Sequence, residues 1–239
     1  MRCDPTGARL GYRARMPRAI LFDLYDTLVN GSTEADRRRV SERMAQDLGV
    51  DPALFANLVR DSARERFAGA LGDLEGTVRV LAARAGVRPP DAAIRLACLR
   101  RVTMARALLW PSATTLHTLD ALHRDGWRLG LVTNCSAETP ALWKGTPFAS
   151  RFHAVVFSCE FGVAKPDPAI FIACCSSLGV SPPECLYVGD GADDELTSAA
   201  SLGMTVVQTT EYAPANGSWP KERIGAIADL RRWITNSGG

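Results

Sequence analysis

Three acidic residues in this sequence stand beside or just beyond apolar runs, where packing explains a carboxylate poorly. Asp23 follows the apolar run 19–22, Asp190 follows the run 185–188 and its glycine, and Asp194 comes four residues later. Asp is among the residues least often buried without a partner. Carboxylates in such places can act as nucleophiles or can hold a divalent cation, and several of them together repel one another unless a positive charge is present.

Three further polar residues suit the recognition of an anion. Thr133 and Asn134 close the apolar run 127–132, and Lys165 lies in the segment Gly162-Val-Ala-Lys-Pro-Asp167. Only three of the 28 basic residues of the chain are Lys, so a Lys in this context stands out from a surface that uses arginine. Lys165 would also offset the negative charge of the acids.

The pattern of apolar residues predicts the elements that position these side chains. Short apolar runs indicate buried strands, and longer segments closed by glycine indicate helices. The alternation of the two predicts an α/β fold, a doubly wound parallel sheet with helices on both faces. The expected strands are 19–22, 127–132, 154–157, 185–188 and 204–208, the last in the chain, and the expected helices are 112–125, 137–144, 167–178, 192–202 and 224–235.

This topology brings distant residues together. The carboxyl ends of all strands in a parallel sheet face one edge, and ligands bind there. Asp23, Thr133, Lys165 and Asp190 should therefore converge in one crevice, with Asp194 one helical turn beyond Asp190. Mg²⁺ suits a site made only of oxygen ligands, because it binds one or two carboxylates together with water and substrate phosphate.

Between the first and second expected strands the pattern is helical throughout. Helices are predicted over 34–48, 52–67 and 73–85 and from about 90 to just before Pro111, with Thr33 and Asp51 as N-terminal caps of the first two. We therefore expect a core formed by 18–30 and 111–239, an inserted α-helical cap over 31–110, and a flexible arm over 1–17, with the start at either Met1 or Met16.

Composition narrows the possible partners. The chain has 239 residues, 46% of them apolar, and a net charge of +2, which gives no indication of a nucleic-acid partner. No apolar run is long enough to cross a bilayer, and no apolar stretch follows the basic N-terminal residues as in a signal peptide. The seven Cys residues show no Cys-x-x-Cys spacing, which favours reduced thiols and a cytoplasmic location. The oligomeric state stays open.

Four ordered motifs carry a family resemblance. Over about residues 18–235 the chain resembles the haloacid dehalogenase-like (HAD) hydrolase superfamily with an inserted helical cap. Each motif alone is weak, and the four in this order and strand context are specific. They are Phe22-Asp-Leu-Tyr-Asp-Thr27, Val132-Thr-Asn134, Lys165-Pro-Asp167 and Val188-Gly-Asp-Gly-Ala-Asp-Asp194.

The resemblance implies a role for each matching residue. Asp23 matches the nucleophile, which becomes a covalent aspartyl intermediate. Thr133 and the amide of Asn134 match the groups that bind oxygens of the transferring group, and Lys165 offsets charge on nucleophile and phosphate. Transfer of this kind depends on positioning and charge stabilisation.

The resemblance also implies a metal site. In the phosphatase branch of the family, Mg²⁺ is held by residues matching the Asp23 carboxylate, the backbone carbonyl of Tyr25 and Asp190, and Asp194 holds a water of the metal. The substrate is then a small anionic molecule that carries a phosphate, and neither a nucleic acid nor a membrane is a partner.

Tyr25 departs from the phosphatase pattern. Phosphatases of the family have Asp at this position as general acid and base, a contribution of roughly 10²–10⁴-fold. Tyr, with a reference pKa of about 10, can donate a proton or contact the substrate but is a poor base at neutral pH.

Three functions remain open. The first is Mg²⁺-dependent hydrolysis of a phosphoric monoester. The second is hydrolysis of a 2-haloacid, because the dehalogenases of the superfamily carry Tyr at the position of Tyr25; an arginine of their cap accepts halide, and Arg60 is the candidate here. Against it, this chain keeps Gly189-Asp190, which dehalogenases lack. The third is a binding or regulatory module without catalysis, and the retained set of Asp23, Lys165, Asp190 and Asp194 argues against it.

Several other polar residues have simpler explanations. We expect Asp26 to hydrogen-bond its own loop and Thr27 to hydrogen-bond nearby backbone. Asp167 and Asp193 are interpreted as helix-start residues, and Glu195 as similarly dispensable. Arg60, Arg64 and Arg66 share a predicted helix running toward the core and could hold an anionic substrate, but in an arginine-rich chain they are interpreted as surface residues.

Overall fold

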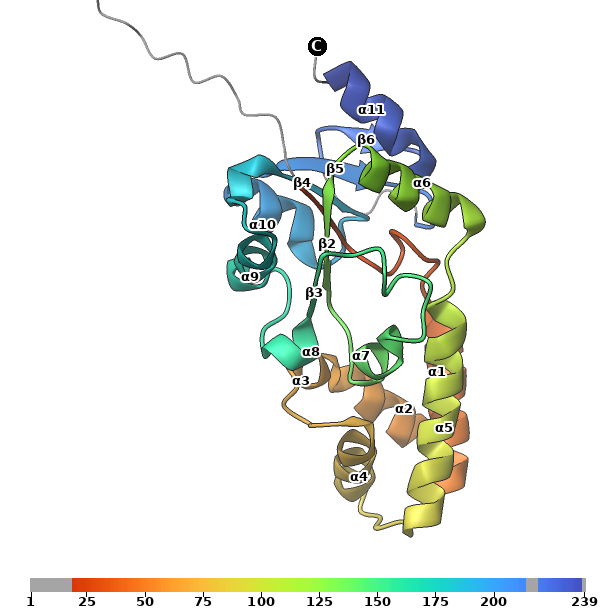
Figure 1. The fold of residues 1–239 in the computed structure, drawn as a ribbon. Coiled ribbons are helices and arrows are strands. Elements are labelled where there is room, and N and C mark those ends of the chain that lie inside the picture. The colour runs from red at the N-terminus through yellow and green to blue at the C-terminus, as the bar shows by residue number, and fades with distance from the viewer. Residues whose placement is uncertain (1–18, 214–218, 238–239) are drawn as a thin grey trace, which may run out of the picture.

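The computed structural model describes residues 19–213 and 219–237 and shows a sheet with flanking helices joined to a group of further helices (Figure 1). The predicted arm over 1–17 lies outside the described residues.

The sheet has six strands in the order β3-β2-β1-β4-β5-β6, and every pairing is parallel. The first strand of the chain is therefore central, and Phe22 lies between Leu131 and Val188 of its neighbours. The strands are β1 Ala19–Phe22, β2 Arg128–Thr133, β3 Ala154–Phe157, β4 Cys185–Gly189, β5 Thr205–Thr209 and β6 Arg223–Ile224. The expectation that 204–208 forms the last strand is wrong, because the two-residue β6 is too short to leave a periodic pattern.

Both faces of the sheet are covered, as a doubly wound fold requires. Side chains of a strand alternate between the faces, so Ala19 and Leu21 pack into one apolar cluster and Ile20 and Phe22 into another. The first cluster includes residues of α9 (Pro168–Leu178) and α10 (Glu195–Ser201), and the second includes residues of α6 (Ala113–Arg124) and α11 (Leu230–Ser237). The predicted fold class is confirmed.

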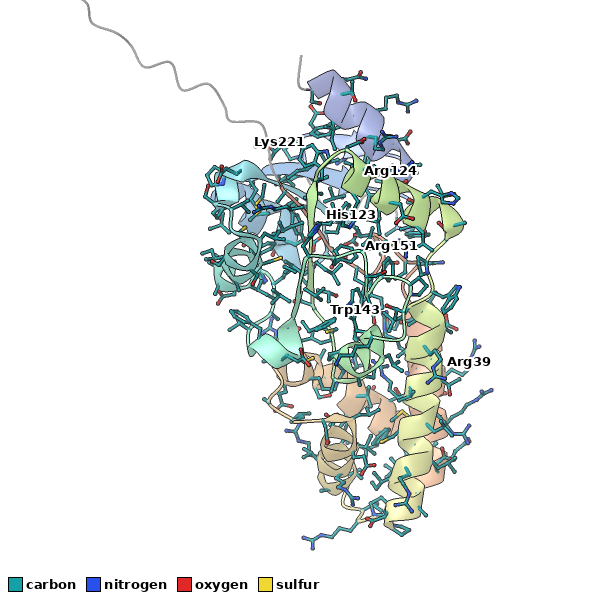
Figure 2. All side chains as sticks on the ribbon, in the orientation of Figure 1. Arg39, His123, Arg124, Trp143, Arg151 and Lys221 are labelled. Carbon is teal, nitrogen blue, oxygen red and sulfur yellow. The ribbon has the colours of Figure 1, made fainter. Side chains whose placement is uncertain are left out.

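Short helices and 3-10 turns join these elements. They are α7 Glu138–Trp143, α8 Ser158–Phe161 and the 3-10 turns Pro182–Glu184, Ala192–Asp194 and Ile227–Asp229. Trp143 of α7 lies inside the molecule, stacked on Phe148 with ring centroids 5.7 Å apart (Figure 2). This aromatic contact fixes α7 against the second apolar cluster.

Five helices between β1 and α6 have an apolar core of their own, which includes Met44, Phe55, Leu81 and Ile94. We call them the cap helices: α1 Glu34–Leu48, α2 Pro52–Asp61, α3 Ala63–Phe67, α4 Leu74–Arg84 and α5 Asp91–Leu108. They lie below the sheet in Figure 1.

Most boundaries of the cap helices follow their capping residues. Thr33 accepts a hydrogen bond from the backbone N of Asp36, and Asp51 accepts one from that of Leu54, as expected. The single helix expected over 52–67 is instead two helices that meet at Ser62. The Ser62 hydroxyl donates to the Val59 carbonyl, a local bond that competes with helix continuation.

Within the part of the chain that the structure describes, no helix combines the length and the apolar character that a membrane crossing needs.

Candidate active site

Asp23 lies at the carboxyl edge of the sheet because the sheet pairing continues one residue beyond β1. Its backbone N donates to the Val188 carbonyl over 2.9 Å, which places Asp23 beside the end of β4. Its carboxylate forms an ion pair with the ammonium group of Lys165, and both side chains are buried. Residues 142 positions apart thus meet, as the predicted topology requires.

Glu195 is the second partner of Lys165, and it occupies a place that the sequence did not indicate. It is fully buried, pairs with Lys165, accepts a hydrogen bond from the Tyr187 hydroxyl at 2.7 Å and accepts another from the Gly191 backbone N at 3.1 Å. A Cβ at Gly189 would stand 2.0 Å from its carboxylate, so this packing requires glycine at 189. The interpretation of Glu195 as dispensable is wrong, since it orders the Lys165 ammonium group.

Asp194, in contrast, is exposed. The expected helix over 192–202 begins only at Glu195, because Asp193 and Asp194 both have left-handed backbone with φ of 53°. The one-turn spacing assumed between Asp190 and Asp194 therefore fails, and the carboxylate that reaches Lys165 belongs to the next residue. The sequence did carry a signal for left-handed backbone here, since Gly and Asp adopt that conformation more readily than most residues.

Carboxylate oxygens of Asp23, Asp190 and Glu195 lie within 4.8 Å of one another. Burial, and then the charge of Asp23, raises the pKa of Asp190 to about 6. Burial raises the pKa of Glu195 to about 7, although Lys165 acts in the opposite direction. Burial lowers the pKa of Lys165, but the two carboxylates outweigh it and the pKa rises above its ordinary value.

One lysine does not balance three buried acids, so the cluster has a place for a further cation. Its donors are all oxygens, which Mg²⁺ prefers. Glu195 already accepts three hydrogen bonds, whereas the Asp190 carboxylate accepts one among the described residues, from the Ala192 backbone N at 3.3 Å. The residues present therefore fit a magnesium ion between Asp23 and Asp190.

Thr133 and Asn134 lie at the end of β2, beside this cluster. The Thr133 hydroxyl is buried and has no hydrogen-bond partner among the described residues, so it is free to donate to a bound group. The Asn134 side chain is engaged: it accepts from the Lys165 backbone N at 2.8 Å, and it donates to the Lys165 carbonyl at 3.1 Å and to Asp193 at 2.8 Å. The side chain of Asn134 thus positions the Lys165 segment.

Tyr25 turns its hydroxyl toward α7, where it lies 2.9 Å from the Thr139 hydroxyl. Burial raises the pKa of Tyr25 well above its ordinary value, so the phenol keeps its proton. It can share a hydrogen bond, but it has no tendency to act as a base.

Three further side chains test smaller expectations. Asp26 accepts a hydrogen bond from the Gly31 backbone N at 2.9 Å, which confirms its role within the loop. Thr27 is fully buried, and its hydroxyl has no partner among the described residues, so the expected backbone bond is absent there. Asp167 caps α9 through the Ala169 backbone N, as expected.

A crevice of about 200 Å³ lies between the sheet edge and the cap helices. Tyr25 and Asn134 line it from the sheet side, and Arg37, Phe67 and Arg101 line it from the cap helices. Arg60 does not line this crevice; it is exposed and pairs with Asp61 at 2.9 Å. The interpretation of Arg66 as a surface residue is wrong, because its guanidinium turns inward and donates to the Val59 carbonyl and the Ser136 hydroxyl.

The parallel sheet and the acidic cluster at its carboxyl edge define a Rossmann-like α/β enzyme. Residues 17–203 match the family described as haloacid dehalogenase-like hydrolase, and the chain belongs to that family. The predicted family is therefore confirmed, and the protein is a hydrolase.

Similar proteins include two phosphatases. The chain is 32% identical over 197 residues to a glyceraldehyde 3-phosphate phosphatase of Methanopyrus kandleri, covering 81% of this chain and 84% of the relative. It is 33% identical over 219 residues to a phosphoglycolate phosphatase of Rhodospirillum rubrum, covering 89% and 86%. A solved structure of a 2-haloacid dehalogenase from Pseudomonas syringae covers 94% of this chain and 100% of its own, with a TM-score of 0.67 at 21% identity, a similarity of fold.

Proposed function

We propose that this hydrolase is a Mg²⁺-dependent phosphatase that hydrolyses phosphoric monoesters of small metabolites. The observation that carries the proposal is the place of Asp23: its carboxylate is paired with Lys165 and lies within 4.8 Å of Asp190. A nucleophile, a fixed positive charge and a second carboxylate for a metal are thus in one buried site. The two phosphatase relatives support the same activity.

In the proposed reaction the Asp23 carboxylate oxygen attacks phosphorus, and the bond from phosphorus to the ester oxygen breaks. Water then attacks the aspartyl phosphate, which releases inorganic phosphate and restores the carboxylate. The buried Thr133 hydroxyl and the backbone N–H of Asn134 would donate to phosphoryl oxygens. Lys165, held by Glu195, would stabilise the charge on those oxygens.

The Asp23 and Asp190 carboxylates and the backbone carbonyl of Tyr25 would hold Mg²⁺. Asp194, which is exposed on its turn, would reach the ion only through water. When bound, Mg²⁺ supplies positive charge opposite the phosphoryl oxygens and offsets the repulsion between the two carboxylates. Glu195 would act through Lys165 instead of binding the metal.

The source of protons limits the substrates that react fast. Tyr25 cannot accept a proton near neutral pH, and its hydroxyl already lies against Thr139. Esters with good leaving groups need little protonation of the departing oxygen, so they should react faster than alkyl phosphates.

The cap helices and the location of the enzyme belong to the same proposal. Residues 31–110 would form a cap that covers the crevice and selects the substrate.

The sulfur atoms of Cys175 and Cys185 are 3.6 Å apart and remain free thiols, in keeping with a reducing compartment such as the cytoplasm.

The test is release of phosphate from p-nitrophenyl phosphate with and without Mg²⁺. We expect turnover that depends on Mg²⁺ and is lost in Asp23→Asn. Turnover that is unchanged in Asp23→Asn would contradict the assigned nucleophile, and no turnover of activated phosphates would contradict the proposed activity.

One observation favours a second candidate, hydrolysis of 2-haloacids. Tyr25 occupies the position where dehalogenases of the superfamily carry Tyr, and its phenol faces the crevice. In that reaction Asp23 would displace halide from carbon, and water would hydrolyse the ester. Release of chloride from 2-chloropropionate in the presence of a chelator, with no turnover of activated phosphates, would favour this candidate.

A further inference from the structure

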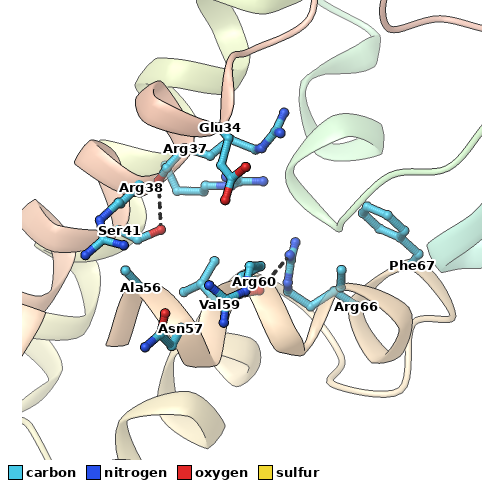
Figure 3. Close-up of a pocket in the computed structure, with 12 residues that line it drawn as sticks. Glu34, Arg37, Arg38, Ser41, Ala56, Asn57, Val59, Arg60, Arg66 and Phe67 are labelled. Atoms are coloured by element: carbon cyan, nitrogen blue, oxygen red, sulfur yellow. Dashed lines mark hydrogen bonds between the residues drawn. The ribbon is translucent and has the colours of Figure 1, made fainter. Parts of the chain in front are cut away.

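A second cavity of about 320 Å³ lies among the cap helices α1, α2 and α3, with one residue from α5 (Figure 3). Its charged lining is unusual because arginine predominates. Glu34 contributes the single carboxylate among the lining residues, and the basic residues are Arg37, Arg38, Arg60, Arg66 and Arg101. The lining residues therefore carry more positive than negative charge.

Three of these arginines are neutralised by a carboxylate. Arg38 pairs with Glu42, Arg60 with Asp61 and Arg101 with Glu138.

Arg37 and Arg66 differ from the other three. Arg37 donates to the carbonyl and hydroxyl of Ser32. Arg66 donates to the Val59 carbonyl at 3.0 Å, to the Ser62 hydroxyl at 3.2 Å and to the Ser136 hydroxyl. Neither has a carboxylate within ion-pair distance in residues 19–213 and 219–237.

Of the two, Arg66 is the more buried, so its charge has the greater need of a negative partner. Burial and then the charge of Arg101 lower the pKa of its guanidinium to about 10, although the charge of Glu138 acts in the opposite direction. Arg66 is still charged at neutral pH. Its hydrogen-bond partners among the described residues are neutral oxygens, and its guanidinium carbon lies 5.6 Å from the centroid of the Phe67 ring. A charge removed from water in this way is costly unless a counter-charge is present. The cavity therefore has an electrostatic place for an anion.

The cavity adjoins the crevice between the sheet edge and the cap helices. Arg37, Phe67 and Arg101 line both spaces. Arg66 also reaches the sheet side directly, since its partner Ser136 stands two residues after Asn134. In Figure 3 the guanidinium of Arg66 rises from α3 toward the space between Arg37 and Phe67. A molecule held at the sheet edge beside Tyr25 and Asn134 would therefore have Arg37 of the cap helices in the same crevice.

We propose that Arg37 and Arg66 bind a second anionic group of the substrate, a carboxylate or a phosphate, at the end remote from the scissile phosphate. This inference rests on the proposed phosphatase function and narrows the substrate to doubly anionic phosphorylated metabolites. Guanidinium groups suit the role, because they bind carboxylate and phosphate through paired hydrogen bonds and stay charged when partly buried.

The test compares 3-phosphoglycerate with glycerol 3-phosphate, which differ in the group remote from the phosphate, a carboxylate against a hydroxymethyl. We expect kcat/KM to be at least about tenfold higher for 3-phosphoglycerate, the effect of about one charge-assisted hydrogen bond. Arg37→Gln and Arg66→Gln should each lower the ratio of the two kcat/KM values about tenfold, because the carboxylate-bearing substrate then binds more weakly and its KM rises. Arg66→Lys should restore part of the ratio.

Arg39→Gln is the matched control. Arg39 lies on the same helix as Arg37, is exposed on the outside of the molecule (Figure 2) and does not line the cavity. The ratio in this variant should equal that of the wild type. If Arg66→Gln fails to fold, the exposed Arg37 still provides the test.

Each outcome bears on a separate claim. Turnover of p-nitrophenyl phosphate with an unchanged substrate ratio in Arg37→Gln and Arg66→Gln would overturn the inference and leave the phosphatase proposal standing. Activation of p-nitrophenyl phosphate hydrolysis by malonate would identify a separate effector and would also overturn it. If no phosphate ester reacts, calorimetry decides: 3-phosphoglycerate binding that is lost in Arg66→Gln and kept in Arg39→Gln supports the anion site, and no binding to the wild type refutes it.

Discussion

The molecule has two charged clusters of opposite sign, one at the sheet edge and one among the cap helices. At the sheet edge, three buried carboxylates share Lys165. In the cap cavity, five arginines surround one glutamate. The first cluster has more negative than positive charge, and in the second Arg37 and Arg66 have no carboxylate partner among the described residues. A substrate with a metal-bound phosphate at one end and a second anion at the other would satisfy both.

The two clusters also differ in how the fold builds them. The acids come from strand ends and from the start of α10, and Lys165 comes from the loop between α8 and α9. Direct hydrogen bonds join Lys165 with Asp23, Glu195 and Tyr187. The arginines come from helix surfaces, and Arg37 and Arg66 bond only to neutral oxygens among the described residues. The acidic cluster, which is joined by direct hydrogen bonds, is suited to the chemical step. The arginines of the cap cavity are suited to substrate selection.

The largest expected effect tests the acidic cluster. Asp23→Asn keeps the shape of the side chain but removes the nucleophile, so phosphate release from p-nitrophenyl phosphate should fall by at least about 10³-fold. Asp26→Asn is the control, since Asp26 serves its own loop. A fall of similar size in the control would mean that the loop, and not the carboxylate of Asp23, was disturbed.

Glu195→Gln tests whether that cluster holds Lys165 in place. The change leaves a buried ammonium group with one carboxylate instead of two, which should cost about 3 kcal/mol of unfolding free energy and also lower kcat. Urea denaturation measures the cost. The exposed neighbour Asp194 provides the comparison, because Asp194→Asn should leave the unfolding free energy unchanged. If both variants lost the same unfolding free energy, the assignment of Glu195 as the partner of Lys165 would be refuted.

A smaller effect is expected at Tyr25, between the two clusters. Tyr25→Asp would supply a carboxylate able to donate and accept a proton, so hydrolysis of alkyl phosphates should rise about tenfold or more, while that of p-nitrophenyl phosphate changes little. The dependence of kcat/KM on the pKa of the leaving group measures this. An unchanged dependence would show that another group already supplies the proton.

The sequence predicts the acidic cluster better than the basic one for a physical reason. Asp23, Thr133 and Asp190 follow buried strands, and a parallel sheet sends all such ends to one edge, so strand prediction alone brings them together. The prediction for Arg66 fails because the helix breaks at Ser62, and this break decides which way α3 presents its side chains.

The role of Glu195 could not be predicted from the sequence because the backbone of the two residues before it is left-handed. Had the helix begun at 192 as expected, Asp194 would stand one turn from Asp190, but Asp193 and Asp194 have positive φ and the helix begins only at Glu195. Short-range backbone geometry of this kind is set by tertiary contacts such as those of Glu195 with Lys165 and Gly191, which a single sequence does not display.

A crystal structure of the protein with Mg²⁺ and aluminium fluoride, a mimic of the transferring phosphoryl group, tests the central claim most directly. We predict one ion in six-fold coordination, about 2.1 Å from an oxygen of Asp23 and from an oxygen of Asp190, with the fluoride beside Lys165. Bound fluoride with no ion shared by Asp23 and Asp190, or an ion held at another place, would contradict the account.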